Sequence, residues 1–348
     1  MKIIVDAMGG DHAPGSNVRG ALAATREYKA EIILVGKGEE ILKVLAEDGI
    51  GELPAGVEIA HADQVVTMED NPATAFKEKK GSSLTIGLTM LRDKKGDAFV
   101  TAGSTGALLS AATLITKRIR GIRRAALAPV LPVSGAVLID CGATAECKPE
   151  YLLQYAFMGS YYAGHALGKP EPRVGLLNIG AEPSKGTDLQ VETYVLLKKA
   201  AEEGRINFVG NVEPKEAVEG AVDVIVSDGY AGNIMLKAME GTGSMLVHEL
   251  KKMFLSSTKS KLAALLVKDG MKDMKKLMDA SEVGGTALLG ISKPVIKAHG
   301  SSNSYAIQNA IRQAIQFANS GIIEDIEENI SYMRLPPKNI QTDGAAEE

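Results

Sequence analysis

The sequence has no tryptophan, few other aromatic residues and only two cysteines among 348 residues. Aromatic residues make up 4%, so base-stacking platforms for nucleic acid are not expected. The formal net charge of −4 excludes a globally basic protein, and any attraction to acidic partners must come from local patches. Cys141 and Cys147 cannot form a disulfide framework and fit no common zinc spacing, which indicates a reducing compartment and predicts no metal site.

A long apolar run is also missing. The longest uncharged apolar stretch, Ala125–Ile139, is interrupted by Pro129 and Pro132 and is too short to span a bilayer. The N-terminal segment Met1–Gly10 contains Asp6 and has no apolar signal core. We therefore expect a cytoplasmic protein.

Glycine, in contrast, is abundant, with 37 copies, and it often follows short runs of isoleucine, valine and leucine. Because these runs lack polar alternation, they predict strands buried on both faces of a parallel sheet. The predicted strands are Lys2–Val5, Ile32–Val35, Ala98–Thr101, Ala136–Ile139, Arg173–Leu177, Asn207–Val209 and Val222–Val226. Helical patterns between them include Asn17–Tyr28, Glu39–Glu47, Ala107–Thr116, Tyr151–Ala166 and Asp188–Glu202.

This alternation of strands and helices predicts the fold class. We expect a three-layer α/β/α fold with a mostly parallel sheet and right-handed crossovers. The catalytic unit is predicted to cover residues 1–333, and the tail 334–348 is predicted to be disordered.

Five predicted strands are followed by loops rich in glycine and polar residues. The carboxyl ends of parallel strands form the binding crevice of an open sheet, so these loops are expected to meet on one side. They are Asp6–Asp11, Thr101–Gly106, Asp140–Ala143, Asn178–Gly180 and Ser227–Asn233. One such loop is often turn chemistry alone, whereas five in corresponding positions predict a functional crevice.

The loop Thr101–Gly106 is a candidate anion site. Its glycines let the backbone approach an anion, its hydroxyls can donate, and the following helix offers a positive N-terminus. The candidate phosphate-binding residues are Gly103, Ser104, Thr105 and Gly106. The equally weighted alternative is a plain helix cap at Ser104 or Thr105.

Lys185 and Asn233 are the candidate catalytic residues. Lys185 follows Ser184 at a predicted strand end, where a lysine can reach a phosphate as a mobile point charge. The alternative for Lys185 is a solvated surface lysine. Asn233 precedes a predicted helix, and its amide can either donate to a developing oxyanion or cap that helix.

Other candidates lie in the same loops or just before the last long helix, and they are Asp6, Gly9, Gly10, Asp11, Asp228, His299 and Ser301. His299 can serve as an acid, a base or a phosphate donor, although a lone histidine is more often structural. Asp6 and Asp11 do not define a metal site, and hydrogen bonding to loop amides is favoured. Cys141 has no base placed beside it by sequence and is interpreted as a small buried residue.

Positive charge gathers in two segments. The first includes Arg118, Arg120 and Arg123, and it either docks an acidic protein or forms a solvated helix end. The second, Lys251–Lys276, holds eight lysines against two acids and carries leucines on one helical face. Its residues predicted to contact a carrier protein or a membrane are Lys259, Leu262, Leu266 and Lys268. The alternative is a solvated helical hairpin whose leucines pack at a dimer interface.

Taken in order, these blocks resemble a known family. The similarity runs from Met1 to about Ala318 and is carried by Asp6–Asp11, Thr101–Leu108, Asp140–Met158, Asn178–Gly186, Gly210–Glu213, Asp228–Lys237, Gly284–Gly290 and Lys297–Ser302. In these blocks the chain resembles the PlsX-type phosphate acyltransferases. The resemblance implies a fold like that of phosphotransacetylases and isopropylmalate dehydrogenases, and a homodimer.

The resemblance also implies an activity. Acyl carrier protein and inorganic phosphate would be the substrates, acyl phosphate for phospholipid synthesis the product, and a membrane glycerol-phosphate acyltransferase the partner. Phosphate, held by Thr101–Gly106 and Lys185, would attack the carrier thioester directly, and Asn233 would stabilise the oxyanion.

Two other functions are weighed against this one. A dehydrogenase of the related fold needs a nucleotide site, but Gly36–Glu40 lacks the third glycine of a dinucleotide fingerprint and carries two glutamates. No cofactor is therefore expected. A non-catalytic lipid or nucleotide sensor would not need Lys185, and Lys185→Ala would leave its function intact.

Overall fold

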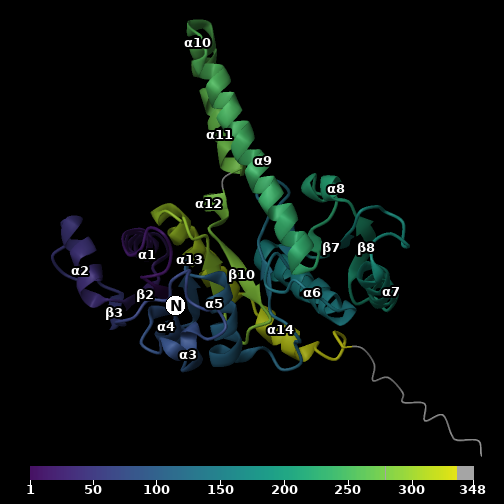
Figure 1. Cartoon of the computed structure of the whole chain (residues 1–348), viewed down its shortest axis with the longest axis horizontal. Helices are drawn as coiled ribbons and strands as arrows, with labels where there is room; N and C mark the ends of the chain where they lie inside the picture. Colours follow the sequence, from purple (N-terminus) through teal and green to yellow (C-terminus); the bar gives the residue numbers. More distant parts are fainter. Residues whose placement is uncertain (279, 335–348) are drawn as a thin grey trace, which may run out of the picture.

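The computed structural model describes residues 1–278 and 280–334, and its strands form two sheets (Figure 1). The first sheet has the order β3-β2-β1-β4-β11-β10-β5, and β10 runs antiparallel to both of its neighbours. The second has the order β6-β9-β7-β8 and is parallel throughout. The strands are β1 Lys2–Asp6, β2 Glu31–Gly36, β3 Val57–His61, β4 Ala98–Thr101, β5 Ala126–Ala128, β6 Val137–Ile139, β7 Arg173–Leu177, β8 Asn207–Val212, β9 Val224–Val226, β10 Gly285–Leu289 and β11 Val295–Ala298.

Helices cover both faces of the sheets, which confirms the predicted three-layer α/β/α class. Alternate residues of one strand, such as Ile3 and Ile4 of β1, belong to separate buried clusters on opposite faces. Helices of one face are α1 Gly15–Tyr28, α2 Gly38–Glu47, α6 Pro149–Tyr161, α7 Asp188–Glu202, α13 Ser304–Asn319 and α14 Ile322–Glu328. Those of the other face are α3 Ala75–Glu78, α4 Ser83–Arg92, α5 Thr105–Ala111, α8 Pro214–Val218 and the start of α9 Gly229–Leu255. Two π-helical turns, η1 Ala112–Lys117 and η2 Tyr162–Ala166, extend α5 and α6.

Every predicted strand is present, but the strands expected in one sheet are divided between two. The apolar stretch Ala125–Ile139 contains the point of division, since its two ends form β5 of the first sheet and β6 of the second. Pro129 and Pro132 lie between them, where proline interrupts a strand.

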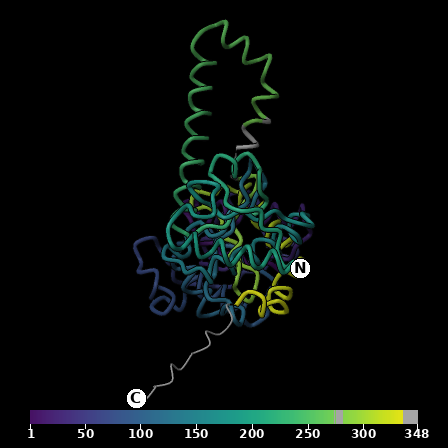
Figure 2. Tube along the Cα trace, turned by 90° about the vertical axis from the view of Figure 1, so that its right-hand side faces the viewer, coloured from purple at the N-terminus to yellow at the C-terminus, as the bar shows by residue number. Residues whose placement is uncertain are grey.

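A helical hairpin projects from the body of the molecule, as Figures 1 and 2 show. Helix α9 leads outward, α10 Thr258–Leu266 lies at the tip, α11 Lys268–Met278 returns, and α12 Ala280–Val283 rejoins the body. The predicted amphipathic segment 251–276 corresponds to the outer part of this hairpin. Of the predicted tail 334–348, residues 335–348 lie outside the described residues. Among the described helices, none is long and apolar enough to cross a bilayer.

Candidate active site

A cavity of about 620 Å³ draws its wall from both sheets. Four of the five predicted loops contribute to it, through Asp11, Thr105, Gly142 and Asn233, and His299 joins them after β11. The apolar lining includes Leu127, Pro129, Val130, Leu131, Val133, Leu236 and Met239. Polar and apolar lining together suit a ligand with a polar head and a hydrocarbon chain.

Asn233 reaches the cavity because α9, which follows β9, begins in direct contact with the loop after β6. Asp228 caps this helix, and its Oδ1 accepts hydrogen bonds from the amides of Tyr230 (2.9 Å) and Ala231 (2.8 Å). The cap is therefore Asp228, and Asn233 lies one turn further along with its side chain exposed toward the cavity. The sequence left two interpretations of Asn233, an oxyanion donor or a helix cap. Because Asp228 is the cap, the Asn233 amide can donate to a ligand.

Asp140 holds the loop after β6 in place. Its fully buried carboxylate accepts hydrogen bonds from the amides of Leu127, Cys141, Ala143 and Thr144, at 2.7–3.2 Å. Burial raises the pKa of Asp140 to about 6, and the four amides act against that rise. Asp140 thus links the loop after β6 to β5, and the start of α9 packs against it.

Asp6 does the same for the first sheet. Its Oδ2 accepts a hydrogen bond from the Thr101 hydroxyl (2.7 Å), whose oxygen accepts one from the Gly103 amide (3.0 Å). Burial raises the pKa of the Asp6 carboxyl. The predicted role for Asp6, hydrogen bonding within the loops, is therefore confirmed, since Met8 N also donates to it (3.1 Å).

Glycines 9 and 10 let the two loops approach closely. A β-carbon on Gly9 would come within 2.7 Å of the Gly103 nitrogen. Gly10 has a φ of +99°, and a β-carbon there would lie 2.9 Å from the Gly300 carbonyl oxygen. The Asp11 amide donates to that same carbonyl (2.8 Å), so the loops after β1 and β11 are joined.

His299 and Ser301 form a pair at the cavity's edge. The His299 Nδ1 and the Ser301 hydroxyl lie 2.8 Å apart, and His299 is exposed. Both side chains can donate a hydrogen bond to a bound anion, the histidine depending on the tautomer of its ring.

The predicted phosphate loop divides between two roles. Ser104 caps α5, with its Oγ accepting from the Ala107 amide (3.5 Å), so the helix-cap interpretation of Ser104 is confirmed. Thr105 lines the cavity, whereas Gly103, Ser104 and Gly106 do not. Gly103 instead packs against Gly9, and Gly106 against Pro72.

Lys185 does not line the cavity. Its side chain is exposed, and its loop is held by the Asn178 amide, which donates to the Lys185 carbonyl (3.0 Å), and by Asn211, which donates to Glu182 (2.8 Å). Because β7 and β9 are parallel neighbours, this loop follows the strand next to the one that precedes Asn233. Lys185 therefore lies at the same sheet edge, outside the wall.

Cys141 lies in the wall but is buried, and burial raises the pKa of its thiol well above the ordinary range. A thiol with a raised pKa carries little thiolate and is a poor nucleophile. This agrees with its interpretation as a small buried residue. Within residues 1–278 and 280–334, no three His, Cys, Asp or Glu side chains group closely enough to hold a metal ion.

Sequence reasoning missed three charged residues of the cavity lining: Lys237 and Glu240, which pair with each other on α9 (2.7 Å), and Lys297 of β11. The Lys297 side chain is only 8% exposed, and burial lowers its pKa to about 8. The available signal was a lysine inside the apolar strand Val-Ile-Lys-Ala, just before His299-Gly300.

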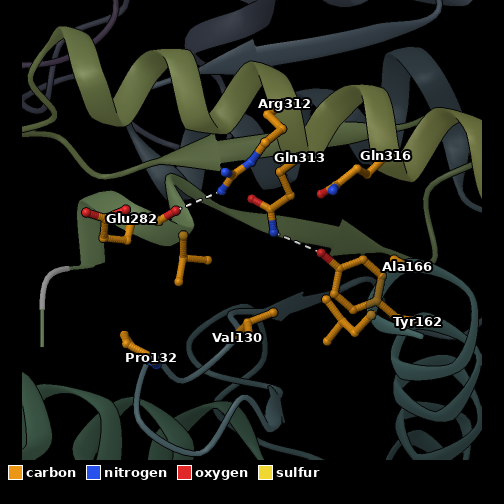
Figure 3. Close-up of a pocket in the computed structure, with 10 residues that line it drawn as sticks. Val130, Pro132, Tyr162, Ala166, Glu282, Arg312, Gln313 and Gln316 are labelled. Carbon is orange, nitrogen blue, oxygen red and sulfur yellow. Dashed lines mark hydrogen bonds between the residues drawn. The ribbon is translucent and has the colours of Figure 1, made fainter. Parts of the chain in front are cut away.

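A second cavity of about 500 Å³ adjoins the first and shares Val130, Pro132 and Val283 with it. Figure 3 shows Gln313 reaching from α13 toward Tyr162, to whose hydroxyl its Nε2 donates (2.8 Å). Arg312 bonds the Glu282 carbonyl (2.8 Å) at the other end. Gln316 is a further polar residue of the lining, and the rest, including Ala166 and Leu167, is apolar. The apolar part can accept a hydrocarbon chain.

Solved structures with the same fold include phosphotransacetylases. A phosphotransacetylase from Streptococcus pyogenes matches with a TM-score of 0.61 and 18% identity, covering 91% of this chain and 94% of that one. EutD phosphotransacetylase from Staphylococcus aureus matches with a TM-score of 0.57 and 16% identity, covering 91% and 94%. At these identities the likeness establishes the fold alone.

Sequence comparison identifies the family. A model described as "Fatty acid synthesis protein" matches residues 1–325. The chain is 46% identical over 335 residues to a phosphate acyltransferase of Alkaliphilus oremlandii, covering 96% of this chain and 98% of the relative. It is 42% identical over 342 residues to that of Clostridioides difficile, covering 97% and 99%. The fold and these matches define an acyltransferase. The chain belongs to the phosphate acyltransferase family.

Proposed function

We propose that this enzyme transfers an acyl group from the thioester of acyl carrier protein to inorganic phosphate, and so makes acyl phosphate for phospholipid synthesis. The observation that carries the proposal is the cavity, in which Asn233, Thr105 and His299 gather beside an apolar wall. The names of the relatives support transfer to phosphate.

In the proposed reaction a phosphate oxygen attacks the thioester carbonyl carbon. The new C–O bond forms, the C–S bond breaks, and the carrier thiolate leaves and takes up a proton from solvent. The Asn233 amide donates to the oxyanion, which is the kind of stabilisation that often contributes most to acyl transfer. Phosphate dianion is itself a nucleophile, so positioning provides most of the rate.

Lys185 and the loop Thr101–Gly106 enter this proposal as phosphate contacts. Thr105 supports this part, since its side chain reaches the cavity. Lys185 acts from the neighbouring strand end, where its flexible side chain is exposed. Lys185→Ala distinguishes the proposed enzyme from a non-catalytic sensor. The enzyme is expected to lose turnover in this variant, whereas a sensor would keep its function.

The acyl chain is proposed to follow the apolar wall past Val130 into the second cavity. Replacing Ala166 by Phe would then shorten the accessible cavity. The measurement compares kcat/KM for carriers loaded with palmitoyl and with octanoyl groups. A selective loss of the longer substrate supports the route, and an equal effect on both contradicts it.

The hairpin is proposed to contact an anionic membrane surface from the cytoplasm. Leu262, Leu265 and Leu266 near its tip are 63%, 68% and 83% exposed, and Lys259 and Lys268 flank them. An amphipathic helix with exposed leucines and lysines can lie on lipid. Such contact would bring acyl phosphate to a membrane glycerol-phosphate acyltransferase.

The acidic carrier protein and a second copy of the chain are the other proposed partners. Arg118 and Arg120 offer charge to the carrier, whereas Arg123 already pairs with Glu150 (3.0 Å). The activity itself is tested by incubating the protein with palmitoyl carrier protein and phosphate and trapping acyl phosphate with hydroxylamine.

A further inference from the structure

Three polar residues form a row across adjacent strands of the first sheet. Asp6 of β1, Thr101 of β4 and Lys297 of β11 stand at corresponding positions, since β1 pairs with β4 in the register Val5–Val100 and β4 with β11 in the register Thr101–Lys297. Residues side by side in a parallel sheet point to the same face. This row lies at the carboxyl end of the strands, on the face that carries α4 and α5.

Lys297 is the member of this row that lines the cavity. Its Nζ donates to the Ala102 carbonyl (3.3 Å) and to the carbonyl of Ala298. An ammonium group has three N–H donors, so two carbonyls leave one for a ligand. The Ala102 carbonyl belongs to the predicted phosphate loop and the Ala298 carbonyl to the residue after Lys297, and together they hold the ammonium in place.

The charge of Lys297 is buried and, among the residues that the structure describes, has no directly bonded carboxylate. Burial lowers the pKa of Lys297 to about 8, Asp6 and Asp11 act against that shift, and Lys237 on α9 adds to it. Within the described residues, Lys297 makes no ion pair at 4.0 Å or less, and the Asp6 carboxylate bonds Thr101 instead. A buried cation without a directly bonded carboxylate is costly, and a bound anion relieves that cost.

We propose that Lys297 is the principal phosphate-binding cation of this enzyme, holding the nucleophile at the floor of the cavity within reach of Asn233. This inference rests on the proposed function for the identity of the anion as substrate. Lys297 differs from Lys185 in being buried, fixed by two carbonyls and part of the wall.

The test compares Lys297→Met and Lys297→Gln with wild type. Loss of one charge-assisted bond predicts a KM for phosphate that rises about 10- to 100-fold, while the KM for the acyl carrier protein stays within about twofold. The matched control is Lys293→Met, because Lys293 is a half-buried lysine of the segment before β11 and lies outside the cavity. It is expected to behave as wild type.

Isothermal titration with inorganic phosphate, without any acyl donor, is the second readout. Wild type and Lys293→Met should bind phosphate, and both Lys297 variants should bind it about tenfold more weakly or not at all. Thermal melting establishes that each variant is folded, and Gln preserves a donor for the carbonyls where Met does not.

The two proposals fail separately. If wild type makes acyl phosphate and both Lys297 variants keep its KM for phosphate, the role of Lys297 is overturned and the activity stands. If wild type makes none but binds phosphate through Lys297, the activity fails and the anion site stands. If wild type binds no phosphate and makes no acyl phosphate, both are overturned.

Discussion

Gly232, in the first turn of α9, lies directly on the backbone carbonyl of Asp140, so that a β-carbon at residue 232 would overlap that oxygen. Gly229 stands in the same relation to the Asp140 carboxylate, with a β-carbon 2.6 Å from Oδ2. Gly229 and Gly232 therefore allow the first turn of α9 to pack closely on the loop after β6. This close packing sets the position of Asn233.

Gly232→Ala should consequently disturb both stability and activity. Forcing a methyl group into this contact is expected to lower the free energy of unfolding by about 1–3 kcal/mol and to lower kcat by moving Asn233. Gly241→Ala is the matched control, since a β-carbon at Gly241 on the same helix meets nothing within 4 Å. That change should raise stability by about 0.5–1 kcal/mol. Urea unfolding measures both, and equal effects would contradict the account.

Asn233→Ala tests the oxyanion role. Removal of one oxyanion donor is expected to lower kcat about 100-fold or more with little change in stability, because Asp228 remains the helix cap. Tyr230→Phe is the control, since Tyr230 is 66% exposed in the same helical turn. Steady-state rates of thiol release from acyl carrier protein provide the measurement. A variant with unchanged kcat would remove Asn233 from the mechanism.

The sequence predicted the fold class because unbroken apolar runs mark strands buried on both faces. It could not show the division into two sheets, since the residues of Ala125–Ile139 are equally apolar on both sides of the break. Strands β3, β5, β10 and β11 were not predicted, and among them β3 contains a glutamate and β11 a lysine, which interrupt the apolar pattern. Pairing between β11 and β4, distant in sequence, cannot be read from local pattern.

Part of the site was predicted from the position of the loops that follow the strands. Asn233, Thr105, Asp11 and His299 follow strands and so arrive at one cavity, as the loop rule requires. The Lys185 loop also follows a strand, but β7 lies beyond β6 and β9 in the order of the second sheet, and its loop falls outside the wall. Lys297 was passed over because a buried lysine is rare and only its strand neighbours Thr101 and Val100 reveal its setting.

The pH dependence of phosphate use follows from Lys297. Burial lowers the pKa of Lys297 to about 8, Asp6 and Asp11 oppose this shift, and Lys237 adds to it. The ammonium is therefore present below pH 8 and lost above it, so kcat/KM for phosphate should fall about tenfold per pH unit above the break. Rates measured from pH 7 to about 10, less the enzyme-free thioester hydrolysis, check this. In Lys297→Gln the break should disappear, and its persistence would assign it to another group.

The hairpin's exposed leucines predict membrane binding. Leu262→Glu/Leu266→Glu should sharply reduce sedimentation with vesicles of neutral and anionic lipid, because it removes apolar contact and opposes the lysines, each worth about 1 kcal/mol near such a surface. Leu42→Glu/Leu53→Glu is the matched control, with leucines 50% and 41% exposed on the body. Unchanged sedimentation of the hairpin variant rejects the idea. A fall in its oligomeric state, measured by analytical ultracentrifugation, would instead favour a dimer interface.

The most direct test of the account is the fate of labelled phosphate. Wild-type protein, palmitoyl carrier protein and radioactive inorganic phosphate are incubated together, and the label is followed into the lipid-soluble fraction. We predict a labelled acyl phosphate that hydroxylamine converts to palmitoyl hydroxamate, formed in equal amount to the free carrier thiol and absent without phosphate. Release of the carrier thiol with no label in the lipid fraction would show that water is the acceptor, and it would contradict acyl transfer to phosphate.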